Sequence, residues 1–307
     1  MKTIQITEYT KLEDLKITTA MPPPIQAGEL LVRIITTEVN PLDWKLMTGE
    51  LKNFMPTQFP FTPGFGGAGI VEKVGVGISE FSVGDRVYGR SPKMVAEYAS
   101  MRANSVVKIP ENLSFQQAAA LPSSTQVAYS ALHDVAKIQS GQKILIHGAS
   151  GGVGQYAVQL AALAGAEVWA TTSTKNVNAV KKAGALHVID YTKERFEDIA
   201  KEMDFVLDGI SNDIEERSWS VLKRGGLIIS LLRKPLPTRE AEAQKKKAIF
   251  MSGSQKQHMQ VINKLVTDGK LYPVIDSEYE LSEAIKAYTK SRNGHVCGKI
   301  ILRISPA

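Results

Sequence analysis

The segment HGASGGVG, residues 147–154, holds residue types and spacings that could bind a phosphate group. It follows the apolar run KILI and precedes QYAVQLAALAGA, so it lies where a strand turns into a helix. Gly151 and Gly154 match the last two glycines of the pattern G-x-G-x-x-G, with Ala149 in the first position. Glycines let a backbone approach a pyrophosphate, and the N–H groups at a helix N-terminus attract its charge. We therefore predict dinucleotide binding at Gly148, Ala149, Ser150, Gly151, Gly152, Val153 and Gly154.

The end of the next predicted strand indicates which dinucleotide binds. In sites for NAD, an Asp or Glu at this point accepts hydrogen bonds from the ribose 2′-hydroxyl. The segment EVWATTSTKN has no acid after its strand and ends instead in hydroxyl groups, a lysine and an asparagine. We predict that Thr172, Ser173, Lys175 and Asn176 surround the 2′-phosphate of NADPH. If they form only a polar loop, some tolerance of NAD remains.

A second segment with polar side chains that could act in catalysis or binding is VNPLDWK, residues 39–45. Asn40 and Asp43 lie at the end of a predicted strand, and Lys45 enters a turn or short helix. Asn and Asp serve turns and helix N-caps routinely, so capping alone could explain them. The aromatic residues Trp44, Phe54 and Phe65 suit a pocket for a flat apolar substrate, although some of the aromatic residues in this region belong in a core.

The elements that must position these segments change in kind near residue 124. Before it, β-rich stretches such as 29–39, 67–76 and 83–90 are joined by turns at glycine and proline. After it, short apolar strands alternate with amphipathic helices, which predicts a parallel sheet with right-handed crossovers. A helix around residues 250–270 and a strand at 298–304 follow. We predict an α/β protein with a β-rich substrate domain at 1–124, a doubly wound domain at 125–258, and a segment at 259–307 that rejoins the first domain.

Several segments together resemble a known family. They are VNPLDWK, FPFTPGFGGAGIVEKVGVGISEFSVGDRVYG, AAALP, ILIHGASGGVGQYAVQLA, AGALHVIDY and HVCGKIIL. In combination they are similar to the medium-chain dehydrogenase/reductase superfamily, in its zinc-free quinone oxidoreductase branch, and most resemble the plant chloroplast-envelope quinone oxidoreductase homologues. The resemblance implies a GroES-like substrate domain, a Rossmann domain and NADPH as the cofactor.

The resemblance also implies roles for particular residues. Asn40 would hold the nicotinamide end of the cofactor or the substrate oxygen, with Asp43 and Lys45 as further catalytic candidates. Tyr191, Asp208 and Leu231 would line the cofactor, although Asp208 could equally be a loop cap. Lys45 stands where many relatives have tyrosine, Met47 where arginine is common, and Val127 where threonine is frequent. A homodimer is implied as well, through an edge strand at residues 226–232.

Composition excludes several classes of function. The chain has 307 residues, a net charge of +6 and one cysteine, Cys297. Its basic residues are spread out, and the run KKK at 245–247 has no interleaved aromatics, which disfavours nucleic-acid binding. The five histidines share no metal-ligand spacing, so no metal is expected. No run approaches the ~18 apolar residues of a membrane span, and no signal-like start is present, so we expect a cytoplasmic protein.

Without a Lewis acid, hydride transfer requires an acceptor that conjugation already activates. Quinones and α,β-unsaturated carbonyl compounds meet this requirement, so we predict an NADPH-dependent reductase of these substrates. One alternative keeps the fold but reduces enals or enoyl thioesters. Another is an NADPH-binding sensor or nucleic-acid-binding protein with little turnover, which the departures at Lys45, Met47 and Val127 would favour.

Overall fold

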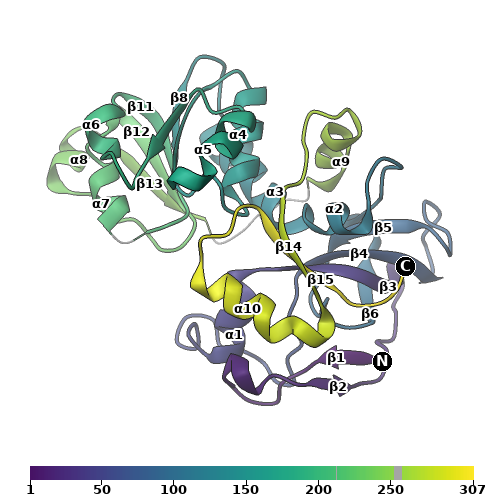
Figure 1. Ribbon diagram of the computed structural model, residues 1–307. Helices are drawn as coiled ribbons and strands as arrows, with labels where there is room; N and C mark the ends of the chain where they lie inside the picture. Colours follow the sequence, from purple (N-terminus) through teal and green to yellow (C-terminus); the bar gives the residue numbers. More distant parts are fainter. Residues whose placement is uncertain (212, 252–257) are drawn as a thin grey trace. The chain divides into compact units, whose positions relative to one another are not determined.

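The computed structural model describes residues 1–211, 213–251 and 258–307 (Figure 1). The chain forms two compact units: Met1–Ser123 together with Met259–Ala307, and Ser124–His258. Each unit is built around its own large β-sheet. The first unit therefore joins two parts of the chain that are far apart in sequence.

A seven-stranded sheet forms the centre of the first unit. Its order is β14 (Ile275–Glu280), β15 (Lys299–Arg303), β3 (Glu29–Val39), β4 (Gly66–Val74), β5 (Arg86–Arg90) and β7 (Val106–Lys108), and β6 (Tyr98–Arg102) also pairs with β3. The central strand β3 is antiparallel to β15, β4 and β6. Because ELLVRIITTEV is rich in β-branched and aliphatic residues, it suits a strand buried along nearly its whole length.

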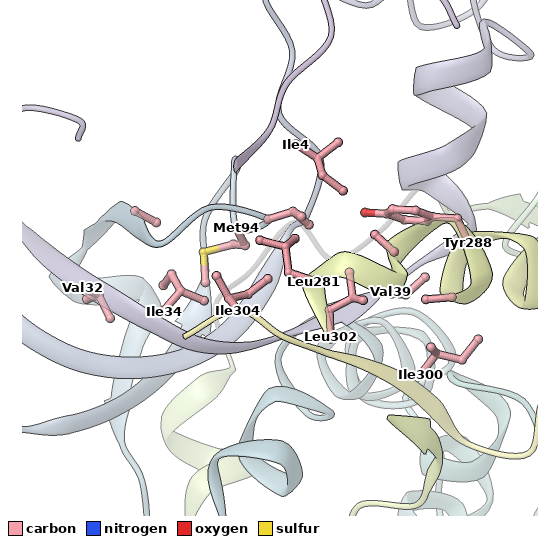
Figure 2. Packing of buried hydrophobic residues seen from close by; sticks show 14 of the residues in the cluster. Ile4, Val32, Ile34, Val39, Met94, Leu281, Tyr288, Ile300, Leu302 and Ile304 are labelled. Carbon is pink, nitrogen blue, oxygen red and sulfur yellow. The ribbon is translucent and has the colours of Figure 1, made fainter. Parts of the chain in front are cut away.

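The remaining elements of the first unit cover this sheet. They are β1 (Lys2–Ile4), β2 (Ile17–Thr19), α1 (Pro41–Thr48), α2 (Phe115–Ala119), α9 (Met259–Thr267), α10 (Ala284–Asn293) and the short 3-10 segments Leu12–Asp14, Ala103–Ser105 and Leu281–Glu283. Figure 2 shows part of the core, where Leu281 and Tyr288 lie near Ile300 and Leu302 of β15. The C-terminal part of the chain thus supplies one wall of the core that the N-terminal part begins.

The second unit contains a six-stranded, wholly parallel sheet. Its order is β10 (His187–Asp190), β9 (Glu167–Thr172), β8 (Lys143–Ile146), β11 (Met203–Asp208), β12 (Leu222–Ser230) and β13 (Lys247–Phe250). Numbered along the chain this is 3-2-1-4-5-6, the order of dinucleotide-binding folds. The predicted doubly wound sheet is confirmed, and its strand order reverses between β8 and β11, the position where such sheets bind ligands.

Helices connect these parallel strands. They are α4 (Gly154–Leu163), α5 (Val177–Lys182), α6 (Phe196–Ile199), α7 (Asp213–Ser218) and α8 (Arg239–Ala243), with a 3-10 turn at Thr174–Asn176. The helix before the sheet begins as α3 (Pro122–Tyr129) and continues as a π-helix at Ser130–Ala136. Helix α4 is buried along most of its length, which fits its run of alanine, valine and leucine.

Two expectations from the sequence need correction. Residues 226–232 do not form a sheet edge, because β12 pairs with β11 on one side and with β13 on the other. The helix expected around residues 250–270 begins at Met259 in the described chain, and Phe250 instead ends β13. Part of that expectation, residues 252–257, lies outside the described residues.

Candidate functional site

The glycine segment forms a tight turn between β8 and α4. The Ala149 N–H donates to the Thr171 carbonyl (3.1 Å), and the Gly151 N–H donates to the Gly148 carbonyl (2.9 Å). Gly148 has a φ of +66°, which favours glycine. A Cβ on Gly154 would lie 2.2 Å from the Gly148 oxygen, so no larger residue fits there. The glycines thus allow the helix to start directly against the end of the strand.

This turn leaves several backbone donors free. Within the part of the chain that the structure describes, the N–H groups of Ser150, Gly152, Val153 and Gly154 make no hydrogen bond. They lie at the N-terminus of a ten-residue helix, where the helix dipole also attracts negative charge. The segment predicted for dinucleotide binding therefore carries the donors that a pyrophosphate requires.

Ser150 connects the turn to the end of β9. Its hydroxyl oxygen accepts hydrogen bonds from Thr172 Oγ1 (3.1 Å) and from Asn176 Nδ2 (3.0 Å). Asn176 is buried, and its amide also lies 3.5 Å from Ser173 Oγ. Lys175 beside it is exposed. The structure therefore brings Thr172, Ser173 and Asn176 together with the glycine turn.

The end of β10 adds an acidic side chain next to this loop. Asp190 accepts hydrogen bonds from the hydroxyls of Thr174 (2.6 Å) and Thr192 (2.7 Å). The hydrogen bond from Thr174 is the main cause that lowers the pKa of Asp190 to about 2. Tyr191, which follows, is 51% exposed. Asp190 thus stays ionised and accepts the hydroxyl proton of Thr174 in a hydrogen bond, while Tyr191 lies at the surface.

Buried polar groups lie at the carboxyl ends of β11 and β12. Asp208 Oδ1 accepts the N–H groups of Ile210 (2.8 Å) and Ser211 (2.9 Å), whereas Oδ2 is buried and has no hydrogen-bond partner in the described part of the chain. Burial raises the pKa of Asp208. The Leu231 N–H donates to the Asp208 carbonyl (2.9 Å), which places Leu231 directly beside this end of the sheet. Asp208 therefore caps its loop and keeps one oxygen open.

His147, the first residue of the turn, has a structural role. Its Nδ1 lies 3.0 Å from Thr171 Oγ1, and its Nε2 lies 3.0 Å from Ser218 Oγ. Since the Ser218 hydroxyl donates to the Ile214 carbonyl, Nε2 carries the proton and donates to Ser218. Burial lowers the pKa of His147 to about 3. The ring is therefore neutral at pH 7 and fixes the end of β8.

In the first unit, Asn40 lies between β3 and α1 and contacts a buried ion pair. Lys299 Nζ donates to Asn40 Oδ1 (2.6 Å) and lies 2.7 Å from Glu38 Oε2. The side chains of Lys299 and Glu38 are 4% and 0% exposed. Asn40 Nδ2 is also buried, but within residues 1–211, 213–251 and 258–307 it has no hydrogen-bond partner. One end of the Asn40 amide is thus fixed, and the other is a free donor.

Asp43 lies close by but is enclosed by backbone donors. Its Oδ2 accepts the Asn40 N–H (2.8 Å), and its Oδ1 accepts the Gly64 N–H (3.1 Å). The side chain is fully buried, and this burial raises the pKa of Asp43 to about 7. The charge of Glu38 adds to the increase, whereas Lys299 opposes it. Asp43 thus joins the start of α1 to the loop before β4.

The buried carboxyl of Asp43 makes stability depend on pH. Between about pH 4 and 7 the folded protein keeps a proton that the unfolded chain releases, so the free energy of unfolding falls as pH rises. Relative to an Asp43→Asn variant, the protein is expected to lose on the order of 1 kcal/mol per pH unit across this window. Urea unfolding of both proteins at a series of pH values measures this.

Comparison of the two proteins isolates Asp43 from other titrating groups. His147 contributes with the opposite sign in the same window, because its folded pKa lies below its ordinary value, but it is common to both proteins and cancels in the difference. The amide introduced by Asp43→Asn accepts at one oxygen only, so one of the two hydrogen bonds is lost at every pH, which adds only a constant offset. A difference that stays constant with pH would show that Asp43 does not titrate in this window.

The other candidates in the first unit lie in different surroundings. Trp44 is buried in the core and donates its indole N–H to Ser291 Oγ (3.2 Å). Lys45 Nζ lies 5.5 Å from the centre of the Trp44 ring, a cation-π contact. Phe54 is 67% exposed, and Phe65 is half-buried. The Trp44 ring is therefore committed to the core, and of these aromatic residues Phe54 is the most accessible.

Sequence reasoning did not identify Glu38 and Lys299. Both lie inside predicted strands, where a single charged residue is usually read as facing water. In the structure they meet because β3 and β15 pair with Val39 opposite Ile300. A charged residue within an otherwise apolar strand, as in TTEVN and CGKIIL, was the available signal.

No helix in the described part of the chain combines the length and the apolar character that crossing a bilayer requires. The chain matches two protein families. Residues 26–111 match the family described as the alcohol dehydrogenase GroES-like domain, and residues 183–302 match the family described as zinc-binding dehydrogenase. Among the described residues no group of three or more His, Cys, Asp or Glu side chains could hold a metal ion, so the residues present do not fit zinc.

Similar proteins cover almost the whole chain. It is 35% identical to the quinone-oxidoreductase homolog, chloroplastic, of Spinacia oleracea, over 92% of each chain. It is 32% identical to 2-methylene-furan-3-one reductase of Solanum lycopersicum, over 100% of this chain and 80% of that protein. The structure of the quinone oxidoreductase from Coxiella burnetii superposes with a TM-score of 0.87 at 30% identity, covering 99% of each chain.

These relatives correct one expectation and establish the family. The expected cytoplasmic location is contradicted, because plant relatives at 32–35% identity are named as chloroplastic or chloroplast-envelope proteins. The family resemblance seen in the sequence is confirmed by relatives above 30% identity that align along nearly the full chain. The chain belongs to the medium-chain dehydrogenase/reductase superfamily of oxidoreductases, in its quinone oxidoreductase branch.

Proposed function

We propose that this protein reduces quinones or α,β-unsaturated carbonyl compounds with NADPH. The observation that carries the proposal is the glycine turn, whose four free N–H groups lie where β8 meets α4 in a sheet of order 3-2-1-4-5-6. NADPH, when bound, would supply a hydride from C4 of its nicotinamide to the conjugated acceptor. The names of two similar proteins, a quinone oxidoreductase homolog and a furanone reductase, support these two substrate classes.

NADPH rather than NADH is proposed from the end of β9. Thr172, Ser173 and Asn176 contribute hydroxyl and amide groups there, and the exposed Lys175 contributes a positive charge. Neither β9 nor the 3-10 turn after it, up to Asn176, ends in an acid that would accept hydrogen bonds from a ribose 2′-hydroxyl. The glycine residues would hold the pyrophosphate, and Asp208, Leu231 and Tyr191 are proposed to line the rest of the cofactor.

Asn40 is proposed to act on the substrate side. Reduction of a quinone or enone places negative charge on the carbonyl oxygen, which then needs a hydrogen-bond donor and a proton. Asn40 Nδ2 is a buried donor without a partner in the described chain and can serve such an oxygen. Lys45 and Asp43 remain proposed catalytic candidates, and Phe54 and Phe65 remain proposed substrate contacts. Trp44 is not proposed as a substrate contact, because its ring is buried in the core.

Cofactor oxidation tests the function directly. The loss of nicotinamide absorbance is followed with NADPH and then NADH, against 1,4-benzoquinone, 9,10-phenanthrenequinone and a series of enones and enals. Turnover with NADPH and one acceptor class supports the proposal and identifies the class. Preference for enals or enoyl thioesters would favour the alternative substrates, and binding of NADPH without any turnover would favour a sensor.

The positive charge of Lys175 can be tested with a matched control. The Lys175→Ala variant is expected to bind NADPH about tenfold more weakly, equivalent to about 1.4 kcal/mol, and to bind NADH as before. The Lys181→Ala variant removes the same charge from an exposed position on α5 and is expected to change neither affinity by more than about twofold. Fluorescence titration measures both affinities. Equal effects of the two variants would show only a general charge effect.

A homodimer is also proposed, following the resemblance to the family. The expected edge at residues 226–232 is covered, and the outermost strand on that side is β13. Its residue Ile249 is 39% exposed, and an uncovered strand edge is a common place for another chain to pair. Analytical ultracentrifugation tests this proposal, and a monomeric mass at micromolar concentration would contradict it.

A further inference from the structure

The Asn40 side chain is held from one end only. Lys299 Nζ lies 2.6 Å from Asn40 Oδ1, while Asn40 Nδ2 is buried and has no hydrogen-bond partner among the residues that the structure describes. An ammonium group can only donate hydrogen bonds, so the atom that faces it must be the amide oxygen. Lys299 therefore determines which way round the amide lies and directs the N–H groups away from itself.

Helix capping does not account for this arrangement. Asn40 occupies the N-cap position of α1, where an asparagine side chain usually accepts a backbone N–H of the first turn. Here the Asp43 N–H donates to the Asn40 backbone carbonyl (3.0 Å), and the side-chain oxygen receives Lys299 instead. The Asn40 N–H is in turn accepted by Asp43. The Asn40 and Asp43 N–H groups at the start of α1 thus bond to the Asp43 carboxylate and the Asn40 backbone carbonyl. The side-chain amide of Asn40 is not needed for either bond.

Lys299 is itself held by a buried carboxylate. Glu38 Oε2 lies 2.7 Å from Lys299 Nζ, and Glu38 Oε1 accepts the Ser123 N–H (3.1 Å). A Cβ on Gly66 would lie 2.3 Å from Glu38 Oε1, so glycine at this position makes room for the carboxylate. Glu38 and Lys299 lie on neighbouring strands, β3 and β15, which fix their separation.

This ion pair is costly to bury. Removing two charges from water consumes much of their mutual attraction, and a well-packed apolar pair of similar volume is often as stable or more stable. Stability alone therefore does not explain why the ion pair is buried here, whereas its ability to orient the Asn40 amide does. The positive charge of Lys299 beside the Asn40 oxygen also polarises the amide and strengthens its N–H groups as hydrogen-bond donors.

We propose that Lys299 and Glu38 are positioning residues that fix the Asn40 amide, so that Nδ2 donates a hydrogen bond to the substrate carbonyl oxygen as negative charge develops on it. The inference rests on the proposed reductase function. It assigns Asn40 to stabilisation of the developing oxyanion and assigns the ion pair to the orientation and strength of that donor.

Three variants test the proposal after thermal unfolding has shown that each is folded. Asn40→Asp keeps a partner for Lys299 but lacks the N–H donor. Lys299→Met leaves the buried Glu38 carboxylate without its cation and is expected to be strongly destabilised. The double variant Glu38→Leu/Lys299→Met removes both charges at similar volume, so it is expected to fold. The control Glu278→Leu/Arg303→Met removes an exposed ion pair (2.9 Å) that joins β14 to β15, the strand that carries Lys299.

The expected result is a loss in kcat rather than in cofactor binding. Asn40→Asp is expected to lower kcat about 100-fold, the usual cost of one oxyanion donor, and the Glu38→Leu/Lys299→Met variant about 10-fold to 100-fold. Affinity for NADPH should stay within about twofold in both, and the control should keep the original kcat. Adding Asn40→Asp to the Glu38→Leu/Lys299→Met variant should lower kcat no further than Asn40→Asp does alone, because both changes remove the same interaction.

Other outcomes overturn the proposal. An unchanged kcat in folded Asn40→Asp, or in the folded variant without the ion pair, would exclude the assigned roles. Multiplying effects in the combined variant would show that the ion pair does not act through Asn40. If the unmodified protein binds NADPH but reduces no quinone or enone, the proposed function itself fails, and this is known before any variant is compared.

Discussion

The Gly154→Ala variant is expected to lose about 3 kcal/mol or more of its free energy of unfolding. Helix propensity alone predicts the opposite, since alanine is favoured over glycine within a helix by about 1 kcal/mol. The geometry decides the sign, because a Cβ at this position would lie 2.2 Å from the Gly148 oxygen and 2.8 Å from Ala149 Cα. Both neighbours are backbone atoms, so the turn itself must move. Urea unfolding measures the loss, and NADPH titration is expected to show weakened binding in parallel.

Gly209→Ala is the matched control for this prediction. It makes the same chemical change in the same unit, but apart from its chain neighbours a Cβ there would meet no described atom nearer than Leu231 Cδ1 at 3.9 Å. Its free energy of unfolding is expected to change by less than about 1 kcal/mol. If Gly154→Ala is as stable as the original protein, α4 does not need close contact with the end of β8.

The Gly151→Asp variant is expected to lose about 100-fold in affinity for NADPH, equivalent to about 2.7 kcal/mol, while it stays folded. A Cβ at Gly151 would lie 3.2 Å from the Gly148 oxygen, which is tight but can be relieved by a small shift. The carboxylate would stand beside the free N–H groups of Gly152 and Val153, where the pyrophosphate is proposed to bind. Two like charges about 4 Å apart near a protein surface repel by several kcal/mol.

Gly151→Asn separates charge from bulk in this test. Asparagine has nearly the shape of aspartate but no charge, so its affinity for NADPH is expected to fall by only about fivefold, or about 1 kcal/mol. Fluorescence titration at two salt concentrations measures both variants, and the loss in Gly151→Asp should be smaller at higher salt. Equal losses in the two variants would indicate crowding alone, and no loss in either would exclude this turn as the pyrophosphate site.

Local patterns in the sequence were sufficient to predict most strands and helices of the second unit. The run EVWATT forms β9 over the predicted residues, and GQYAVQLAAL forms α4, because hydrophobic periodicity and glycine signals agree there. The strand KAIF was missed, since it begins with the last lysine of the run KKK, which is typical of a solvated surface. It becomes β13 because its backbone pairs with β12, and that pairing is not encoded in the local composition.

The candidate site was predictable only where it is local in sequence. The glycine turn and the loop after β9 are continuous segments, and the structure joins them through Ser150. The ion pair of Glu38 with Lys299 depends on the register between two strands about 260 residues apart, which neither strand specifies alone. Asp43 illustrates a further limit of prediction from sequence. An aspartate at this position suggested either chemistry or capping, and only the structure shows that it is buried and accepts two backbone N–H groups.

The division of the first unit between two ends of the chain has a consequence for synthesis on the ribosome. The second unit is one continuous segment, so all of it is made before Lys299 is. At elongation rates of about 5–20 residues per second, the chain between β13 and β15 takes several seconds to emerge. During this interval β3 has no β15 beside it, and Glu38 and Asn40 lack their cation. The glycine turn between β8 and α4 can therefore form co-translationally, whereas the surroundings of Asn40 are completed only when β15 leaves the exit tunnel.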